Sequence, residues 1–242
     1  MRYLSKLPLL VLLCTPLLIL GGCWSSEELH DRAFARVMLL DKADNGIELT
    51  LGFPLPNRMS SGKAGGGDAG GASAKPFTFV TKTGKDIGDA YRQIQSDVPR
   101  RITFGQLRNV LIGKKLAQEG VQPIADFAAR EPSIHVNANL FVTEGKVKDF
   151  ADIPVVFERF PTDILTAYAE TKIIVPVTIK DLLMSVYIGG DLVLPRLVFS
   201  RKGAEFEENG NKWMGTDGSV ILRQGKMAGV LSTPETRAAL WI

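Results

Sequence analysis

Side chains that could carry out chemistry are scarce in this chain of 242 residues. It contains two cysteines, Cys14 and Cys23, and two histidines, His30 and His135. Neither histidine has a cysteine or carboxylate neighbour at metal-ligand spacing, and no G-x-S-x-G, P-loop, H-E-x-x-H or C-x-x-C motif occurs. His135 suits a half-buried position at a strand end better than the role of a catalytic base. We therefore expect no catalytic residue, no metal and no cofactor, which disfavours an enzyme.

Cys23 lies at the end of an N-terminal segment that has the features of a secretory signal. Arg2 and Lys6 precede an apolar run over residues 7–20, which is too short to span a bilayer comfortably. Residues 20–23, Leu-Gly-Gly-Cys, resemble the bacterial lipobox. That resemblance implies cleavage before Cys23, a diacylglycerol on its thiol, and acylation of the new amine with a fatty acid such as palmitate. The alternative is an ordinary signal peptide in which Cys23 is incidental.

The charge balance argues against one class of partner. The chain has 29 basic and 26 acidic side chains, and residues 1–22 contribute Arg2, Lys6 and no acid, so 27 basic against 26 acidic side chains remain from Cys23 onward. Nucleic-acid binding through bulk charge is therefore not expected. A hydrophobic content of 45% indicates a folded protein. We expect a signal peptide over 1–22, a tether over 23–33, and two domains.

The first domain is expected over 34–150, with alternating strands and helices that indicate a mixed α/β structure. Apolar residues recur at helical spacing over 85–98, and Gly120 is placed to end a short helix. Residues 60–75 are rich in glycine, so we expect a mobile loop there. The expected strands are 34–40, 47–53, 77–81, 107–113 and 136–143, and the expected helices are 85–98, 114–120 and 123–130.

The second domain is expected over 151–242. Two helices, 162–172 and 178–188, precede strands at 192–199, 212–215, 218–222 and 226–231, which suggest a small antiparallel meander. The inner side of the second helix is expected to carry Leu182, Leu183, Val186 and Tyr187. Ser232 and Glu235 form a possible capping box for a last helix, which the chain end is expected to truncate. The expected fold class is α+β.

Five basic residues allow two interpretations. They could together face anionic lipid headgroups, or they could belong to a solvated surface interleaved with acidic residues, which is the interpretation we favour. The five are Arg100, Arg101, Arg108, Lys114 and Lys115, and the acidic residues are Asp86, Asp89 and Asp97.

The order of several segments resembles the Ger(x)C family, the lipoprotein C subunits of spore nutrient-germinant receptors. The chain begins with Gly22-Cys23-Trp24, then Glu28-Leu29-His30-Asp31, then an apolar strand ending in Asp41-Lys42. Three further blocks look like the same family: residues 84–92 with 99–104, residues 110–113 with 116–120, and residues 225–231 with 235–237 and Trp241. The resemblance extends from about residue 19 to the end of the chain.

Family resemblance implies a non-catalytic subunit on the outer face of the spore inner membrane, assembled with two integral-membrane subunits. Two departures stand out. Gln106 occupies a place where a histidine is expected, and the family's third, C-terminal domain is absent, which suggests a fragment, a truncated gene or an abbreviated member. The alternative function is an extracytoplasmic solute-binding lipoprotein of a transporter, which would need a ligand cleft between two larger lobes.

Overall fold

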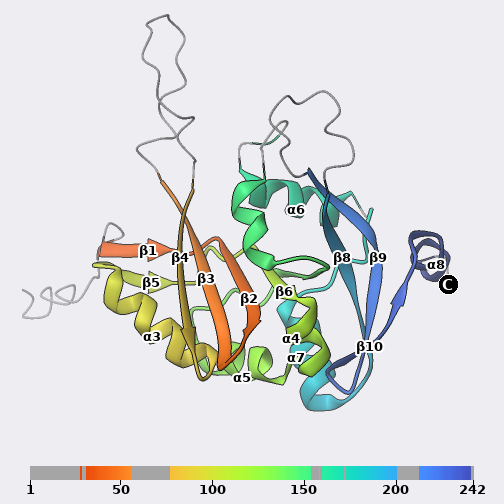
Figure 1. Ribbon diagram of the computed structural model, residues 1–242, viewed down its shortest axis with the longest axis horizontal. Helices are drawn as coiled ribbons and strands as arrows, with labels where there is room; N and C mark the ends of the chain where they lie inside the picture. Colours follow the sequence, from red (N-terminus) through yellow and green to blue (C-terminus); the bar gives the residue numbers. More distant parts are fainter. Residues whose placement is uncertain are drawn as a thin grey trace, which may run out of the picture. The chain divides into compact units, whose positions relative to one another are not determined.

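The computed structural model describes residues 28, 31–55, 77–153, 158, 160–171, 173–200 and 213–240 (Figure 1). The chain divides into two compact units, Met1–Arg32 and Ala33–Ile242. The elements below belong to the second unit, apart from Arg32 at the start of the first strand. The expected mobile loop over 60–75 and the expected signal peptide lie outside the described residues.

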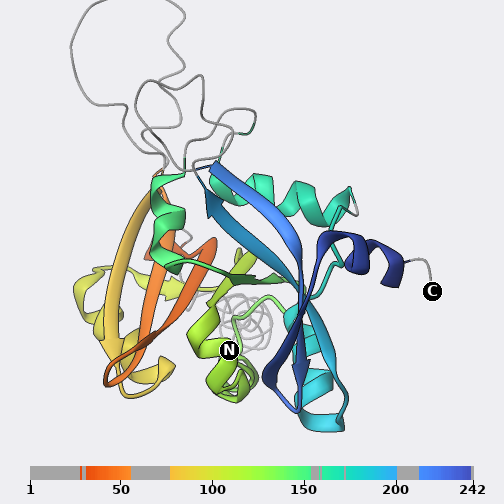
Figure 2. The ribbon, with the colours of Figure 1, turned by 45° about the vertical axis from the view of Figure 1, so that its right-hand side comes forward.

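One mixed sheet of eight strands organises the unit. Its four central strands run parallel, and an antiparallel pair flanks them on each side. Strand direction changes strongly across the sheet, as the right-handed twist of strands requires (Figure 2). The order is β10 (Lys226–Leu231), β9 (Trp213–Arg223), β8 (Leu192–Ser200), β7 (Asn139–Thr143), β6 (Asn109–Gly113), β2 (Val37–Ala43), β3 (Gly46–Pro54) and β4 (Phe77–Gly84). Two short strands, β1 (Arg32–Phe34) and β5 (Arg101–Thr103), pair separately.

Helices cover both faces of the sheet. One face carries α3 (Ile87–Asp97), α4 (Lys114–Glu119), α5 (Gln122–Arg130) and α7 (Ile179–Ile188), and the other carries the 3-10 helix η3 (Val147–Asp152) and α6 (Pro161–Glu170). The last helix, α8 (Thr233–Ala239), follows β10. The two faces make two hydrophobic clusters, and the central strands contribute to both.

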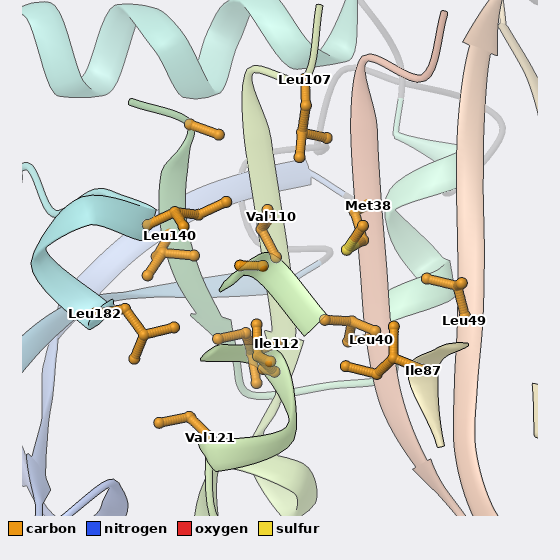
Figure 3. Packing of buried hydrophobic residues seen from close by; sticks show 14 of the residues in the cluster. Met38, Leu40, Leu49, Ile87, Leu107, Val110, Ile112, Val121, Leu140 and Leu182 are labelled. Atoms are coloured by element: carbon orange, nitrogen blue, oxygen red, sulfur yellow. The ribbon is translucent and has the colours of Figure 1, made fainter. Parts of the chain in front are cut away.

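The central strands supply both clusters because successive side chains point to opposite faces. In β6, Val110 and Ile112 belong to the first cluster and Leu111 to the second. Figure 3 shows Val110, Ile112 and Leu140 in the first cluster, with Leu182 of α7 nearby. This double burial explains why the β6 sequence is a continuous apolar run rather than an alternating one.

Local sequence signals place several helix ends as expected. Asp86 caps α3 by accepting a hydrogen bond from the backbone N–H of Asp89 at 2.7 Å. Gly120 ends α4 with a φ of 141°, which only glycine adopts readily. The capping box of Ser232 and Glu235 is present at the start of α8. The predicted fold class, α+β, is confirmed by the helices and the mixed sheet.

Three strand predictions need correction. The expected strand 34–40 is divided into β1 and β2, because the Ala35 N–H donates to Thr103 while that of Arg36 donates to Gly52. The expected strand 136–143 begins only at Asn139, after a turn closed by a hydrogen bond from Ala138 to His135. The expected strands 212–215 and 218–222 are one strand, β9, whose pairing with β8 is irregular near Pro195.

The predicted boundary at residue 151 falls inside a single sheet. Val142 and Thr143 of β7 pair in parallel with Arg196 and Leu197 of β8, so the antiparallel strands β8, β9 and β10 extend the sheet that begins with β2. A parallel pair needs a long crossover, and its two segments therefore leave no local signal of their pairing. Composition changes near residue 151, but backbone hydrogen bonds join a strand before that residue to a strand after it.

Candidate functional site

Most of the residues first expected to carry chemistry lie outside the described part of the chain. These include Cys23, the expected lipidation site, and His30. His135 is described, and it lies half-buried in the turn before β7, where its buried Nδ1 has no hydrogen-bond partner among the described residues. Within the described ranges, no three His, Cys, Asp or Glu side chains gather as metal ligands. No helix in those ranges is long and apolar enough to cross a membrane.

The five basic residues come from different elements of the fold. Arg108 precedes β6 and Lys114 follows it, so at about 3.3 Å per residue the two lie about 20 Å apart along the strand. Lys114 is engaged in an ion pair with Glu144. Arg100 and Arg101 lie at β5, in the separate two-stranded sheet. Asp97 pairs with Lys82 and Asp89 with Arg92, so the favoured interpretation, a solvated surface in which these acidic residues alternate with the five basic ones, stays a prediction.

An ion-pair network joins four strands near the carboxyl ends of β6 and β7. Glu144 accepts hydrogen bonds from Lys114 and from Arg196 Nη1, the latter at 3.3 Å. Arg196 Nη2 also donates to Asp217 Oδ2 at 2.6 Å. The hydrogen bond from Lys114 is the main reason why the pKa of Glu144 lies below its usual range, although partial burial acts in the opposite direction. Carboxyl ends of parallel strands often bind ligands, but these charged groups already satisfy one another.

A second contact at the same edge explains a glycine. Asp41 Oδ1 accepts from the N–H of Lys42 at 2.9 Å, and Asp41 Oδ2 accepts from that of Val147 at 3.4 Å, at the start of η3. A Cβ on Gly113 would lie 2.2 Å from Asp41 Oδ1. Close packing against this carboxylate therefore requires a glycine at position 113. The hydrogen bond between Asp41 and Val147 holds η3 against β2.

A cavity of about 550 Å³ lies between α3 and α5. Tyr91 and Phe127 line it, and both rings pack against the buried ring of Phe104, with centroid distances of 5.5 and 5.9 Å. Burial raises the pKa of Tyr91, and the negative charge of Glu131 adds to this effect. The polar lining carries both signs of charge: Asp86, Arg92, Asp126, Arg130 and Glu131.

Helix α7 presents apolar side chains to solvent beside this cavity. Tyr187 is 55% exposed and Ile188 72% exposed, whereas Leu182 on the inner side is only 1% exposed. The prediction that Tyr187 faces inward is therefore wrong. Its hydroxyl donates to Asp126 of α5 at 2.8 Å, and this hydrogen bond is the main reason why the pKa of Tyr187 is raised. A polar partner on the neighbouring helix draws the ring outward.

This surface could not be predicted from the sequence, because its parts come from distant segments. The α7 helix is apolar around most of its circumference, and such a pattern does not show which side faces the core. Met184 is also exposed, on the side of α7 away from Leu182. An aromatic floor, a rim of both charges and adjacent exposed apolar groups are typical of a recognition surface.

Comparison with known proteins gives a consistent result. Residues 25–199 match the family model described as the spore germination protein N-terminal domain. The chain is 27% identical over 241 residues to YfkR of Bacillus subtilis (strain 168), a candidate spore germination protein, covering 99% of this chain and 60% of YfkR. It is 27% identical over 161 residues to spore germination protein KC of the same organism, covering 65% of this chain and 39% of that protein.

A third relative agrees with the first two. Spore germination protein A3 of Bacillus subtilis (strain 168) is 29% identical over 145 residues, covering 58% of this chain and 36% of that protein. The chain thus spans about three fifths or less of the length of these relatives. No solved structure matches the chain.

Proposed function

Because the chain belongs to the Ger(x)C family of spore germination proteins, we propose that it is the lipid-anchored subunit of a nutrient-germinant receptor. The match of residues 25–199 to the family model carries this proposal. Family membership supports an association with the germinant receptors of the spore inner membrane. The finer claims, that the subunit is non-catalytic and acts by assembling with two integral-membrane subunits, are part of the proposal.

The proposed anchor is a lipid on Cys23. The basic residues, the apolar run and the Leu-Gly-Gly-Cys sequence support it, since position, flanks and spacing all agree with a lipobox. The compact unit begins at Ala33, so about ten residues separate it from the anchor. Two or more acyl chains, at about 0.8 kcal/mol for each buried CH₂, give durable membrane attachment.

The alternative of a solute-binding lipoprotein is not favoured. That function would need a ligand cleft between two larger lobes, whereas one sheet runs through the described part of Ala33–Ile242. The larger cavity lies within a single helical layer, between α3 and α5. A ligand-dependent rise in thermal stability with transported solutes would revive the alternative.

Germination of spores that lack this gene tests the proposal directly. Deletion is expected to abolish or slow germination with a nutrient mixture and to leave germination with a non-nutrient surfactant unchanged, because only the first route needs the receptor. The measurement is the loss of optical density of the spore suspension, in a strain that also lacks paralogous receptors. An unchanged nutrient response in that strain would count against a receptor role.

A further inference from the structure

A second pocket, of about 310 Å³, lies between two hairpins of the sheet. Its walls come from the β2–β3 turn, the β9–β10 turn, the end of α4 and the start of α5. Figures 1 and 2 both show these two hairpins with α4 and α5 between them. The N–H of Val121 donates to the carbonyl oxygen of Gly225 at 2.8 Å, which ties the start of α5 to the β9–β10 turn.

The pocket lining is strongly basic. It includes three lysines, Lys42, Lys85 and Lys226, and one acidic residue, Glu119. Lys42 Nζ pairs with Glu119 at 2.7 Å, whereas the side chains of Lys85 and Lys226 have neither an ion pair nor a hydrogen bond with any described residue. Within the described ranges, two ammonium groups of the pocket therefore have no acidic partner.

The backbone gives this pocket fixed walls. Gly46 has a φ of 120°, and a Cβ there would lie 2.1 Å from the carbonyl oxygen of Gly84. The stem of Lys226 lies over Gly120, since its Cγ is 3.6 Å from the place of a Cβ on that glycine. Gln224 has a positive φ of 51°, and its side-chain amide has no hydrogen-bond partner among the described residues. The residues that carry these amide and ammonium donors thus line one concave surface.

Exposed apolar residues lie at the same end of the sheet. Leu222 pairs with both Leu192 of β8 and Met227 of β10, so the α7–β8 connection and the β9–β10 turn are neighbours. Ile188, at the end of α7, is the most exposed large apolar residue in the described part of the chain. A basic surface next to exposed apolar side chains is typical of proteins that rest on an anionic membrane surface.

We propose that the pocket of Lys85, Lys226 and Gln224 binds a phosphate group, presented by the headgroup of an anionic phospholipid. Ammonium groups bind phosphate as point charges, and hydrogen bonds to charged oxygens are stronger than neutral ones. The lipid source rests on the proposed membrane attachment, but the pocket's preference for phosphate does not. Binding would hold the two hairpins towards the bilayer and so set the orientation of the tethered unit.

Amine labelling of the full chain tests the proposal. The lipidated protein is reconstituted in vesicles of phosphatidylcholine alone or of phosphatidylcholine with phosphatidylglycerol, and lysine modification is measured residue by residue by mass spectrometry. Phosphate contact keeps an amine protonated and unreactive, so labelling of Lys85 and Lys226 is expected to fall several-fold with phosphatidylglycerol. Lys146 and Lys148, exposed on the other side of the sheet, should be unaffected and serve as internal controls.

A third arm separates the two phosphate sources. Soluble glycerol phosphate is added to the protein in phosphatidylcholine vesicles or in detergent. Protection of the two lysines by glycerol phosphate but not by phosphatidylglycerol would contradict the phospholipid as the source of the phosphate. It would still support a phosphate-binding pocket. Protection in neither arm would overturn the proposal altogether. Because the detergent arm needs no membrane, failure of the proposed anchoring is distinguishable from failure of the pocket.

Two paired variants complete the test. Lys85→Gln and Lys226→Gln are each expected to weaken glycerol phosphate binding about fivefold, the effect of removing one lysine from an anionic surface contact. Lys146→Gln with Lys148→Gln is the matched control and should bind as the unmodified protein does. Equal binding by all variants would contradict the assignment.

Discussion

At the scale of single residues, close packing against the Asp41 carboxylate requires a glycine at position 113. Gly113→Ala would place a Cβ 2.2 Å from Asp41 Oδ1 and 3.1 Å from Val147 Cγ2. The Asp41 carboxylate would have to move away from the N–H of Val147, so we expect a loss of about 1–3 kcal/mol in the free energy of unfolding. Urea denaturation measures it.

Gly229→Ala is the matched control for this substitution. Gly229 also lies in a strand, but a Cβ there meets nothing within 4 Å. We expect a change within about 0.5 kcal/mol, as for other surface substitutions. Equal losses for both variants would mean that the contact with Asp41 is not what requires glycine at position 113.

Cys23 carries the second residue-scale prediction. Cys23→Ala removes the thiol that accepts the lipid, so the chain is expected to move from the washed membrane fraction to the soluble fraction or to remain as the uncleaved precursor. The folded unit, which begins at Ala33, is expected to keep its thermal stability. Cell fractionation with mass measurement of the mature N-terminus checks both expectations.

Cys14→Ala is the control for lipidation, because Cys14 lies in the segment expected to be removed. That variant should fractionate as the unmodified protein does. Membrane retention of a cleaved Cys23→Ala chain, in cells without the partner subunits, would contradict lipid anchoring at this cysteine.

At the scale of elements, the network around Glu144 ties β8 and β9 to the central strands. The hydrogen bond from Lys114 is the main cause of the lowered pKa of Glu144. The Glu144 carboxylate therefore binds a proton less tightly in the folded state than in the unfolded state. The stabilisation is therefore fully present above the unfolded pKa of about 4.3 and is lost as pH falls through the lower folded value. Its size is at most about 1 kcal/mol, since the side chain is partly exposed and solvent weakens such pairs.

Glu144→Gln is expected to remove this pH dependence. At neutral pH the variant should unfold more easily than the unmodified protein, and the difference should shrink as pH falls below about 4. Urea denaturation at a series of pH values measures the difference. Glu170→Gln is the control, because that exposed carboxylate on α6 has no partner among the described residues. A difference that persists unchanged at low pH would show that the carboxylate charge is not responsible.

The same scale shows which features could be predicted from the sequence. The ends of α3, α4 and α8 could, because each depends on a cap within three residues. The outward position of Tyr187 could not, because it depends on Asp126, which is 61 residues away in the chain. The pocket between the two hairpins is lined by both Lys85 and Lys226. These residues are far apart in the chain, so no local sequence pattern predicts that they lie close together. The lipidation motif is local, and residues 20–23 alone predict it, but it lies outside the described residues.

At the scale of the whole molecule, a single sheet predicts cooperative unfolding. The strands on either side of residue 151 share backbone hydrogen bonds, and side chains from both sides share a cluster: Leu111, Phe141, Leu197 and Met214 all pack in the second one. Loss of one part therefore exposes the apolar surface of the other. We expect one unfolding transition for the described part of Ala33–Ile242, as is usual for a single packed unit.

Leu111→Ala with Trp213 as reporter tests this expectation. Leu111 is fully buried in β6, so its truncation should cost about 2–5 kcal/mol. Trp213 lies in β9, on the other side of residue 151, and becomes the only tryptophan once Trp24 and Trp241 are changed to Phe. In a single cooperative unit the fluorescence midpoint of Trp213 falls with Leu111→Ala by the same amount as the far-ultraviolet circular dichroism midpoint. Two independent domains would instead leave the Trp213 transition unchanged, because the cavity left by Leu111→Ala would destabilise only the first domain.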